Sequence, residues 1–398
     1  MHLFLSAGEP SGDEHAAELM AAVADRVPAV RFSGLGGPEM EAAGQDQAFR
    51  LTDLAVMGVL AVLPALRKFW DVYKLAKARI EADRPDAVVL VDFPGFHWHV
   101  ARAAKKAGVP VIWYMPPQLW AWAPWRLRKA KRTVDAVISG LPFEADWYAS
   151  RGVAVDRVPH PFFDEVARHP VYAAVVEELR PDVDRDGGDR VVAVLPGSRG
   201  GEVAKNFPVQ LIAMRRVAAE HPGVRFEVAC HREHQAESCR RMLAEACSQF
   251  GPLPGVRFHV GRTSEVVEAA EMALMVSGSV SLELLARRTP AVVCYRCGPV
   301  MYGLACALLT VDHFSLPNLM AGREVMPETA FVTRKRRHAA KMATVLSRWL
   351  SSPAELAAVR AQLDAVASEV DRPGGAAEAA AAVLRRTGVS REAARVAA

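Results

Sequence analysis

The chain has 398 residues, of which 51% are hydrophobic and 24% are charged, and its formal net charge is +4. This balance excludes a disordered or collagen-like chain and favours a globular protein of two to three domains. No run reaches the ~18 uninterrupted apolar residues of a membrane-spanning helix, and the mild net charge suits an anionic substrate or membrane surface better than a nucleic acid. Residues 1–6 lack the features of a signal peptide, so we expect a cytoplasmic protein.

Short β-branched runs alternate with helix-like segments through the first half of the chain. The runs cover residues 3–6, 30–33, 87–91, 109–114 and 134–139. Each run precedes an amphipathic or capped stretch, which is the pattern of successive βα units. The first half is therefore predicted to form a parallel sheet with helices on its faces.

The alternation stops between residues 166 and 189, where residues 180–189 are acidic, contain glycines and show no periodicity. It resumes from residue 190, and beyond residue 333 the composition becomes rich in Ala, Arg and Glu with helical spacing. We therefore expect an α/β domain over residues 1–165, a linker over 166–189, a second α/β domain over 190–333 and terminal helices over 334–398.

The common nucleotide and hydrolase fingerprints do not occur in this sequence. Residues 34–39 read Gly-Leu-Gly-Gly-Pro-Glu, with Glu where the last glycine of a dinucleotide fingerprint belongs. No GxxxxGK[ST], GxSxG or HExxH motif is present. These observations argue against NAD enzymes, P-loop ATPases and the commonest hydrolases.

Two loops that follow strands in the first half carry acidic and hydroxyl side chains. In residues 6–13, Ser-Ala-Gly-Glu-Pro-Ser-Gly-Asp, glycines flank Glu9 and Ser11, which can reach a crevice at the strand ends. Asp92 ends the apolar run 87–91. A carboxylate at the end of a buried strand is costly unless it is used or paired, so Asp92 is a candidate general base; it could instead cap the next helix.

A loop in the second half is suited to a diphosphate. Residues 195–202 read Leu-Pro-Gly-Ser-Arg-Gly-Gly-Glu, follow a predicted strand and open a predicted helix. Gly197 and Ser198 can expose backbone amides, and Arg199 offers a planar cationic fork. The alternative is a plain strand-to-helix turn with a solvated arginine.

A second loop repeats this arrangement. Residues 276–283 read Val-Ser-Gly-Ser-Val-Ser-Leu-Glu, so that the small residues Ser277, Gly278 and Ser279 form the turn and Glu283 lies in the first turns of the helix. The Glu283 carboxylate can accept hydrogen bonds from a ribose diol. It could equally be an acid placed favourably at the positive end of the helix dipole.

Taken together and in order, these motifs resemble the lipid-A-disaccharide synthases, a family of glycosyltransferases with the GT-B fold. The resemblance extends over most of the chain. The matching residues are 8–13, 36–38, 57–58, 92–96, 120–122, 141–144, 160–161, 195–200, 277–278, Glu283, 295–296 and 315–324.

The resemblance implies two Rossmann-like parallel-sheet domains that face each other across a crevice, with C-terminal helices. It implies an inverting transfer of an acylated glucosamine from UDP-2,3-diacylglucosamine to 2,3-diacylglucosamine 1-phosphate, with release of UDP and without a metal or cofactor. Asp92 corresponds to the catalytic base. The implied acceptor side comprises Gly8, Glu9, Ser11 and Asp13, and the implied donor site comprises Gly197, Ser198, Arg199, Ser277, Gly278, Ser279, Glu283, Asn318 and Arg323.

Some positions depart from the family pattern. His97 replaces the usual Asn, Pro116 a Ser and Pro159 a Gly, all in the acceptor half, which leaves the exact acyl-sugar open. Two alternatives remain. One is a GT-B epimerase or transferase that uses UDP-N-acetylglucosamine with a different acceptor, and the other is a catalytically silent, membrane-associated GT-B protein.

A helical stripe after residue 65 is suited to a membrane surface. Leu66, Phe69, Trp70 and Tyr73 share a helix face, with lysines and arginines around them and an apolar stretch at 57–63 before them. This pattern predicts peripheral contact with a membrane, which the resemblance implies is the cytoplasmic face of the inner membrane, although a core-facing helix would carry the same stripe. The basic run 126–132 could meet phosphates or form a solvated helix face. The sequence leaves open whether the chain forms a homodimer.

Overall fold

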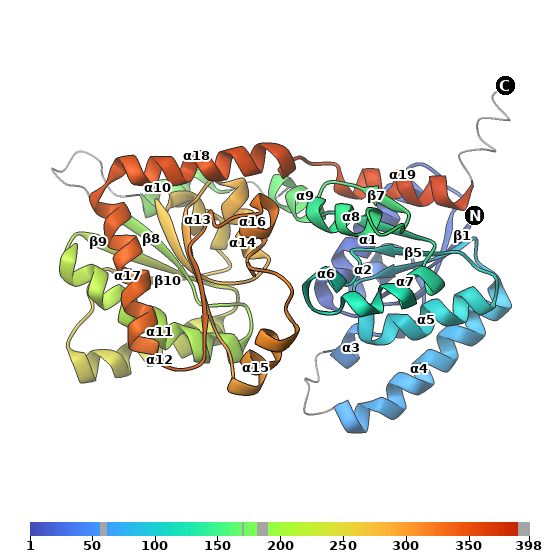
Figure 1. Cartoon of the computed structure of the whole chain (residues 1–398), viewed down its shortest axis with the longest axis horizontal. Coiled ribbons are helices and arrows are strands. Elements are labelled where there is room, and N and C mark those ends of the chain that lie inside the picture. Colours follow the sequence, from blue (N-terminus) through green and yellow to red (C-terminus); the bar gives the residue numbers. More distant parts are fainter. Residues whose placement is uncertain (56–61, 169–170, 181–189, 389–398) are drawn as a thin grey trace. The chain divides into compact units, whose positions relative to one another are not determined.

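The computed structural model describes residues 1–55, 62–168, 171–180 and 190–388. The chain divides into two compact units (Figure 1). Unit 1 contains Met1–Asp164 together with the C-terminal segment Arg372–Ala398, and unit 2 contains Glu165–Asp371.

Unit 1 is built on a seven-stranded sheet in which all pairs are parallel. The spatial order is β3-β2-β1-β4-β5-β6-β7, so the chain adds strands first on one side of β1 and then on the other. Ala7 at the end of β1 pairs with Val91 at the end of β4, and these two strand ends form the topological switch point. The strands are β1 (His2–Ala7), β2 (Arg31–Gly36), β3 (Asp46–Arg50), β4 (Ala87–Val91), β5 (Val111–Tyr114), β6 (Ala136–Ser139) and β7 (Val155–Arg157).

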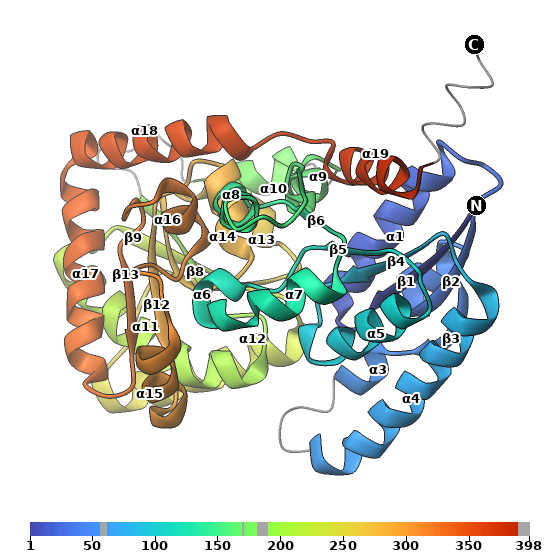
Figure 2. The same ribbon diagram turned by 45° about the vertical axis from the view of Figure 1, so that its right-hand side comes forward.

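Helices cover both faces of this sheet, because successive strand residues alternate between two apolar cores. Phe4 packs with residues of α4 and α5 on one face, and Leu3 and Leu5 pack with α1 on the other. Figure 2 shows α4, α5 and α7 following one another on the first face. The helices are α1 (Pro10–Ala24), α2 (Pro38–Ala42), α3 (Thr52–Ala55), α4 (Val62–Asp83), α5 (Pro94–Lys106), α6 (Leu119–Trp122), η2 (Pro124–Arg126), α7 (Leu127–Thr133), α8 (Pro142–Ala149), α9 (Pro161–Arg168) and α19 (Gly375–Thr387).

The last helix of the chain, α19, belongs to unit 1. It packs against α1, and its Ala379, Ala380 and Val383 join the apolar core around Leu3 and Leu5. Asp164 accepts a hydrogen bond from the Ala376 amide (3.0 Å), which fixes the start of the helix. The expected terminal helices over 334–398 are therefore divided between the units, because α19 covers an apolar face of the first sheet.

The region 166–189, expected as a linker, contains the helix α10 (Ala173–Leu179). Val176 and Leu179 are buried, and α10 packs against α13 (Thr263–Ala269) of unit 2. Unit 2 therefore begins before residue 190, since the apolar face of α10 is covered by that unit.

Unit 2 has a six-stranded parallel sheet of order β10-β9-β8-β11-β12-β13. Its switch point lies between β8 and β11, where Leu195 pairs with Met275. The strands are β8 (Arg190–Leu195), β9 (Val224–Cys230), β10 (Val256–Val260), β11 (Met272–Val276), β12 (Ala291–Arg296) and β13 (Glu328–Phe331). The helices besides α10 and α13 are α11 (Gly200–Glu220), α12 (Glu233–Phe250), α14 (Val280–Ala286), α15 (Pro299–Leu308), α16 (Leu316–Ala321), α17 (Lys335–Ser351) and α18 (Pro353–Val370).

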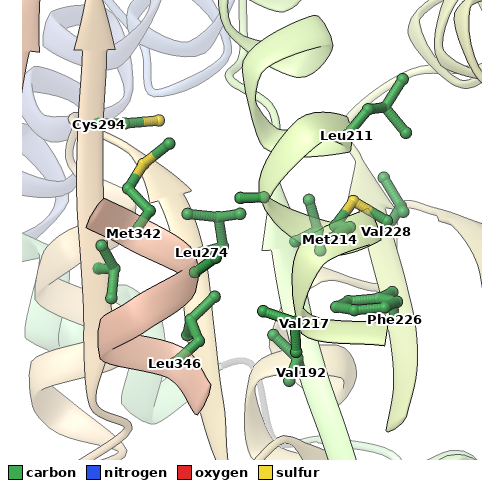
Figure 3. Close-up of a cluster of buried hydrophobic side chains, with 14 of the residues drawn as sticks. Val192, Leu211, Met214, Val217, Phe226, Val228, Leu274, Cys294, Met342 and Leu346 are labelled. Atoms are coloured by element: carbon green, nitrogen blue, oxygen red, sulfur yellow. The ribbon is translucent and has the colours of Figure 1, made fainter. Parts of the chain in front are cut away.

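The core of unit 2 lies between its sheet and the helices α11, α12 and α17. Figure 3 shows Phe226 and Leu274 from the strands with Met214 of α11 and Leu346 of α17. All four side chains are buried. The prediction of two Rossmann-like parallel-sheet domains with C-terminal helices is confirmed. Among the described residues, no helix combines the length and the apolar character needed to cross a bilayer.

Candidate active site

The first group of predicted site residues gathers at the switch point of unit 1. Gly8 and Glu9 follow β1, Asp92 follows β4, and these strands are paired neighbours. A Cβ atom at Gly8 would lie 2.2 Å from the Phe93 ring, so only glycine allows this close approach. Tertiary structure therefore places the Glu9 and Asp92 loops side by side, as expected from the carboxyl ends of adjacent parallel strands.

The backbone at Asp92 is unusual, because both Asp92 and Phe93 adopt the left-handed conformation with φ of 47°. His97, buried in α5, holds this turn: its Nδ1–H donates to the Asp92 carbonyl oxygen (2.7 Å), and the Ser6 hydroxyl donates to its Nε2 (2.9 Å). Left-handed non-glycine residues cost energy and persist where surrounding contacts enforce them. His97, which departs from the family's Asn, thus holds the Asp92 turn through two hydrogen bonds of its ring.

Burial sets the charge states of the Asp92 carboxyl group and the His97 imidazole. The pKa of Asp92 is raised to about 6, chiefly because burial penalises the carboxylate and secondly because of the nearby Glu9 charge, while a hydrogen bond from the Phe93 backbone opposes the shift. Burial lowers the pKa of His97 to about 4, against the effect of its hydrogen bond to Asp92. At neutral pH, Asp92 is mostly ionised and His97 is neutral, which leaves Asp92 as the proton acceptor of the pair.

Asp13 and Ser11 have different surroundings from Glu9. Asp13 is buried, and its carboxylate accepts hydrogen bonds from the backbone amides of Gly37 (2.7 Å), Glu39 (3.0 Å) and Met40 (3.2 Å). Asp13 is therefore remote from α2 in sequence but caps the start of that helix, where a negative charge is favourable. Ser11 is exposed in the first turn of α1.

Glu144 belongs to the matched segment 141–144 and is a buried acid that was not among the predicted site residues. Its carboxylate accepts hydrogen bonds from Trp120 Nε1 (2.8 Å) and the Ser139 hydroxyl (2.6 Å). Its pKa is raised to about 7, mainly by burial and also by the Asp92 charge, against the two hydrogen bonds. The matched segments 120–122 and 141–144 thus meet through the Trp120–Glu144 hydrogen bond and through the Trp120 and Phe143 rings, whose centroids are 4.8 Å apart.

The second group gathers at the switch point of unit 2, where β8 and β11 end. The loop after β8 contains Gly197, with φ of 114°, and Ser198, which precedes α11. The Arg199 guanidinium is 76% exposed and forms an ion pair with Glu202 in the first turn of α11 (3.3 Å). Arg199 therefore has most of its hydrogen-bonding capacity facing solvent, next to the amino end of a long helix.

The loop after β11 lies beside this one, because β11 pairs with β8. Apart from its chain neighbours, no atom of the described residues lies within 4 Å of a Cβ built at Gly278, so the turn is open. Ser277 is half-buried and Ser279 is exposed. Glu283 is buried in α14 and forms an ion pair with Arg287 through Oε1 (3.1 Å). The two predicted phosphate-binding loops are thus adjacent, whereas Glu283 is held by a neighbouring cation.

Asn318 and Arg323 are engaged in contacts within unit 2. The buried Asn318 side chain accepts from the amides of Val325 (2.7 Å) and Met326 (2.8 Å) and donates to the Met326 carbonyl (2.7 Å). Arg323 is exposed and donates to Gln362 on α18 (2.6 Å). Asn318 therefore shapes the loop that leads into β13 and has little capacity left for a ligand.

The predicted membrane stripe lies on α4. The Leu66 side chain and the stretch 57–61 lie outside the described residues. Trp70 is 53% exposed, whereas Phe69 and Tyr73 are half-buried. With α5, these three rings line an apolar cavity of about 430 Å³ that also contacts Phe93 beside Asp92. Val72, Ala76 and Ile80 of α4 pack into the core, and Phe69 and Tyr73 pack against it, so α4 is a core helix whose exposed aromatic ring is Trp70.

Comparison with known proteins identifies the family. A family model described as lipid-A-disaccharide synthetase matches residues 3–362. A lipid-A-disaccharide synthase from Alkalilimnicola ehrlichii is 35% identical over 388 residues, 98% of this chain and 99% of that protein. A putative UDP-N-acetylglucosamine 2-epimerase from Listeria monocytogenes has a TM-score of 0.63 at 11% identity (98% of this chain, 96% of that chain). The S. aureus MnaA-UDP co-structure has a TM-score of 0.61 at 12% identity (98% and 97%). These two structures show the fold, and the GT-B prediction is confirmed.

Proposed function

The chain belongs to the lipid-A-disaccharide synthetase family, and from this premise we propose that it joins UDP-2,3-diacylglucosamine to 2,3-diacylglucosamine 1-phosphate. The products are the lipid A disaccharide 1-phosphate and UDP. The observation that carries this proposal is the placement of the matched motifs at both switch points, where α/β sheets bind their ligands.

In the proposed reaction, Asp92 acts as the general base. It accepts the proton of the acceptor's 6-hydroxyl while that oxygen bonds to the anomeric carbon of the donor. The bond from the anomeric carbon to the phosphate oxygen breaks, and UDP leaves with its electron pair. Such a displacement inverts the anomeric configuration, and a base with a pKa of about 6 is well matched to it at neutral pH.

Unit 1 supplies the acceptor side in this proposal. Gly8 leaves room for Phe93 beside the Asp92 turn, and Glu9 and Ser11 follow on the neighbouring strand end. Glu9 and the exposed Ser11 hydroxyl can hydrogen-bond the hydroxyls of the acceptor sugar. Asp13 contributes by holding the start of α2 in place.

Unit 2 supplies the donor side. The Arg199 guanidinium and the amides at Gly197, Ser198 and Ser277 to Ser279 neutralise the diphosphate as it departs, because cations and oriented amides stabilise developing negative charge. Glu283 accepts from the ribose hydroxyls with its second oxygen, while Asn318 keeps the loop before β13 in shape. Solved structures of this fold include a complex with UDP, which supports UDP as the leaving group.

The acceptor and the donor sugar carry acyl chains, so the enzyme must meet a bilayer. In the proposal, α4 contacts the cytoplasmic face of the inner membrane through Trp70 and the half-buried Phe69 and Tyr73. Exposed Lys68 and Lys74 flank these rings and favour an anionic surface.

The decisive experiment supplies the purified protein with both acylated sugars in mixed micelles. The expected products are the disaccharide 1-phosphate and UDP in equal amounts. If the protein instead releases UDP from unacylated UDP-N-acetylglucosamine alone and forms no acylated product, the proposed substrates are wrong.

A matched pair of variants separates the roles of the carboxylates. Asp92→Asn should lose turnover, whereas Asp25→Asn, which removes an exposed carboxylate near the end of α1, should retain the wild-type rate. Equal rates for the two variants would remove Asp92 from the proposed chemistry.

A further inference from the structure

A second cavity of unit 1 is strongly basic. It has a volume of about 400 Å³ and is lined by Arg102, Lys105, Lys106, Lys129, Arg132 and Thr133. The first three come from the carboxyl-terminal half of α5 and the others from α7, which packs beside α5. Five cationic side chains therefore converge on one pocket from two neighbouring helices.

The positive charge of this pocket is compensated only in part. Lys105 forms an ion pair with Asp135 (2.6 Å). Within the described ranges, Arg102, Lys106, Lys129 and Arg132 form no ion pair with an acidic group; Lys129 lies over the Trp98 ring (4.9 Å) and Arg132 donates to the Arg128 carbonyl. The pKa of Lys129 is lowered by its partial burial and by the neighbouring Arg102 and Arg126. Like charges gathered in this way repel one another unless an anion occupies the pocket.

The donors of the pocket suit a phosphate, since guanidinium and ammonium groups together provide many hydrogen-bond donors and no acceptors, and phosphate oxygens are acceptors. The hydroxyl of Thr133 donates to the Lys129 carbonyl and adds no competing negative charge.

The surroundings of the pocket indicate where this phosphate comes from. Figures 1 and 2 show α5 between α4 and α7. His99 lines the apolar cavity on the α4 side, and Arg102, one turn further along α5, lines the basic pocket. An apolar cavity and a basic pocket whose charge is only partly compensated thus lie on successive turns of one helix. This combination is complementary to an amphiphile and exceeds what a free anion requires.

Along α5, residues of the apolar cavity separate the basic pocket from the Asp92 turn. Arg102 lies eight residues after Pro94, the first residue of α5, which corresponds to about 12 Å along the helix axis. Lys105 and Lys106 lie another turn further on, so the pocket is formed at the end of α5 that is remote from the Asp92 turn. We propose that the pocket between α5 and α7 binds the phosphate of an anionic phospholipid headgroup; this inference rests on the proposed contact of unit 1 with the membrane.

The test compares two double variants on the same helix. Lys129→Gln with Arg132→Gln removes two cations that line the pocket, and Arg128→Gln with Lys131→Gln removes one arginine and one lysine that do not. Sedimentation with vesicles of phosphatidylglycerol and phosphatidylcholine in equal parts measures binding at constant ionic strength. The pocket variant should bind about 30-fold more weakly, and the control should change by about twofold or less.

A second double variant of the pocket controls for loss of folding. Arg102→Gln with Lys106→Gln replaces two exposed residues of α5, so it should keep the wild-type melting temperature and lose vesicle binding as the first variant does. If the pocket and control variants lose vesicle binding equally, the protein binds through the overall positive charge of its surface, and the proposal is wrong. A pocket variant that loses affinity for inorganic phosphate in calorimetry but keeps vesicle binding would also overturn the proposal.

A failure of the headgroup pocket can be distinguished from a failure of the proposed function. The pocket variants should retain wild-type disaccharide formation in detergent micelles, where no bilayer is needed. If Trp70→Ser releases the protein from vesicles and the pocket variants do not, the membrane contact stands and the headgroup pocket is wrong. If the wild-type protein does not bind anionic vesicles, both the contact and the pocket are wrong.

Discussion

Replacing Asp92 with Asn tests the proposed base and the energetic cost of placing it. Asn is nearly the same size, and it adopts the left-handed conformation of this turn more readily than most residues do. The His97 hydrogen bond reaches the backbone carbonyl of residue 92, so it survives the substitution. The change therefore removes the ionisable group and little else.

The size of the effect on stability follows from the pKa. Raising the pKa of Asp92 from 3.8 to about 6 corresponds to about 3 kcal/mol, the cost of the ionised carboxylate in the folded protein. Between pH 3.8 and about 6, Asp92 is protonated in the folded state and ionised in the unfolded state. The free energy of unfolding therefore falls as the pH rises through this range. The cost is fully present above pH 6 and absent below about pH 4. The Asn variant should therefore be more stable at pH 7.5 by up to about 3 kcal/mol.

Two assays check this reasoning. Turnover with both acylated sugars should fall by a factor on the order of 10² to 10⁴, the range for a lost general base, and the wild-type kcat/KM should decline below about pH 6. Urea unfolding at pH 7.5 and at pH 4 should show a gain in stability for the Asn variant only at the higher pH. A wild-type rate would assign Asp92 to a structural role, and a gain that does not depend on pH would refute the account of its burial.

Further substitutions test other parts of the site. Arg199→Lys should weaken UDP binding in calorimetry, because a point charge does not reproduce a bidentate fork, and unchanged affinity would remove Arg199 from the donor site. Asn318→Ala should lower the unfolding free energy by about 3 kcal/mol through its lost buried hydrogen bonds, as measured by urea denaturation. Asp13→Ala should destabilise the protein similarly and leave UDP affinity intact; weaker UDP binding would contradict a purely structural role. Trp70→Ser should release the protein from anionic vesicles without a lower melting temperature. Phe250→Ser, at an aromatic residue of unit 2 that is at least as exposed, should leave vesicle binding unchanged.

The sequence alone predicted the two sheets and the loops at their strand ends, because these features depend on residue patterns along short segments. Alternating β-branched and helical segments require parallel sheets covered on both faces, and the loops after such strands lie at one edge, so the neighbourhoods of Asp92 and Arg199 were predictable. The order of motifs along the chain sufficed to identify the family, because a joint pattern is far more specific than any of its parts.

The partners of individual side chains were decided by tertiary structure. Asp13 and Asn318 carry the chemistry of ligand-binding residues, yet backbone amides occupy their oxygens, and those from α2 lie more than twenty positions away from Asp13. His97 was visible only as a departure from a pattern until the fold placed it under the Asp92 carbonyl. The last helix has a composition that fits either unit, and it joins unit 1 because an apolar face there is open to it. Sequence patterns determine which faces must be buried, whereas the fold determines which distant residues bury them.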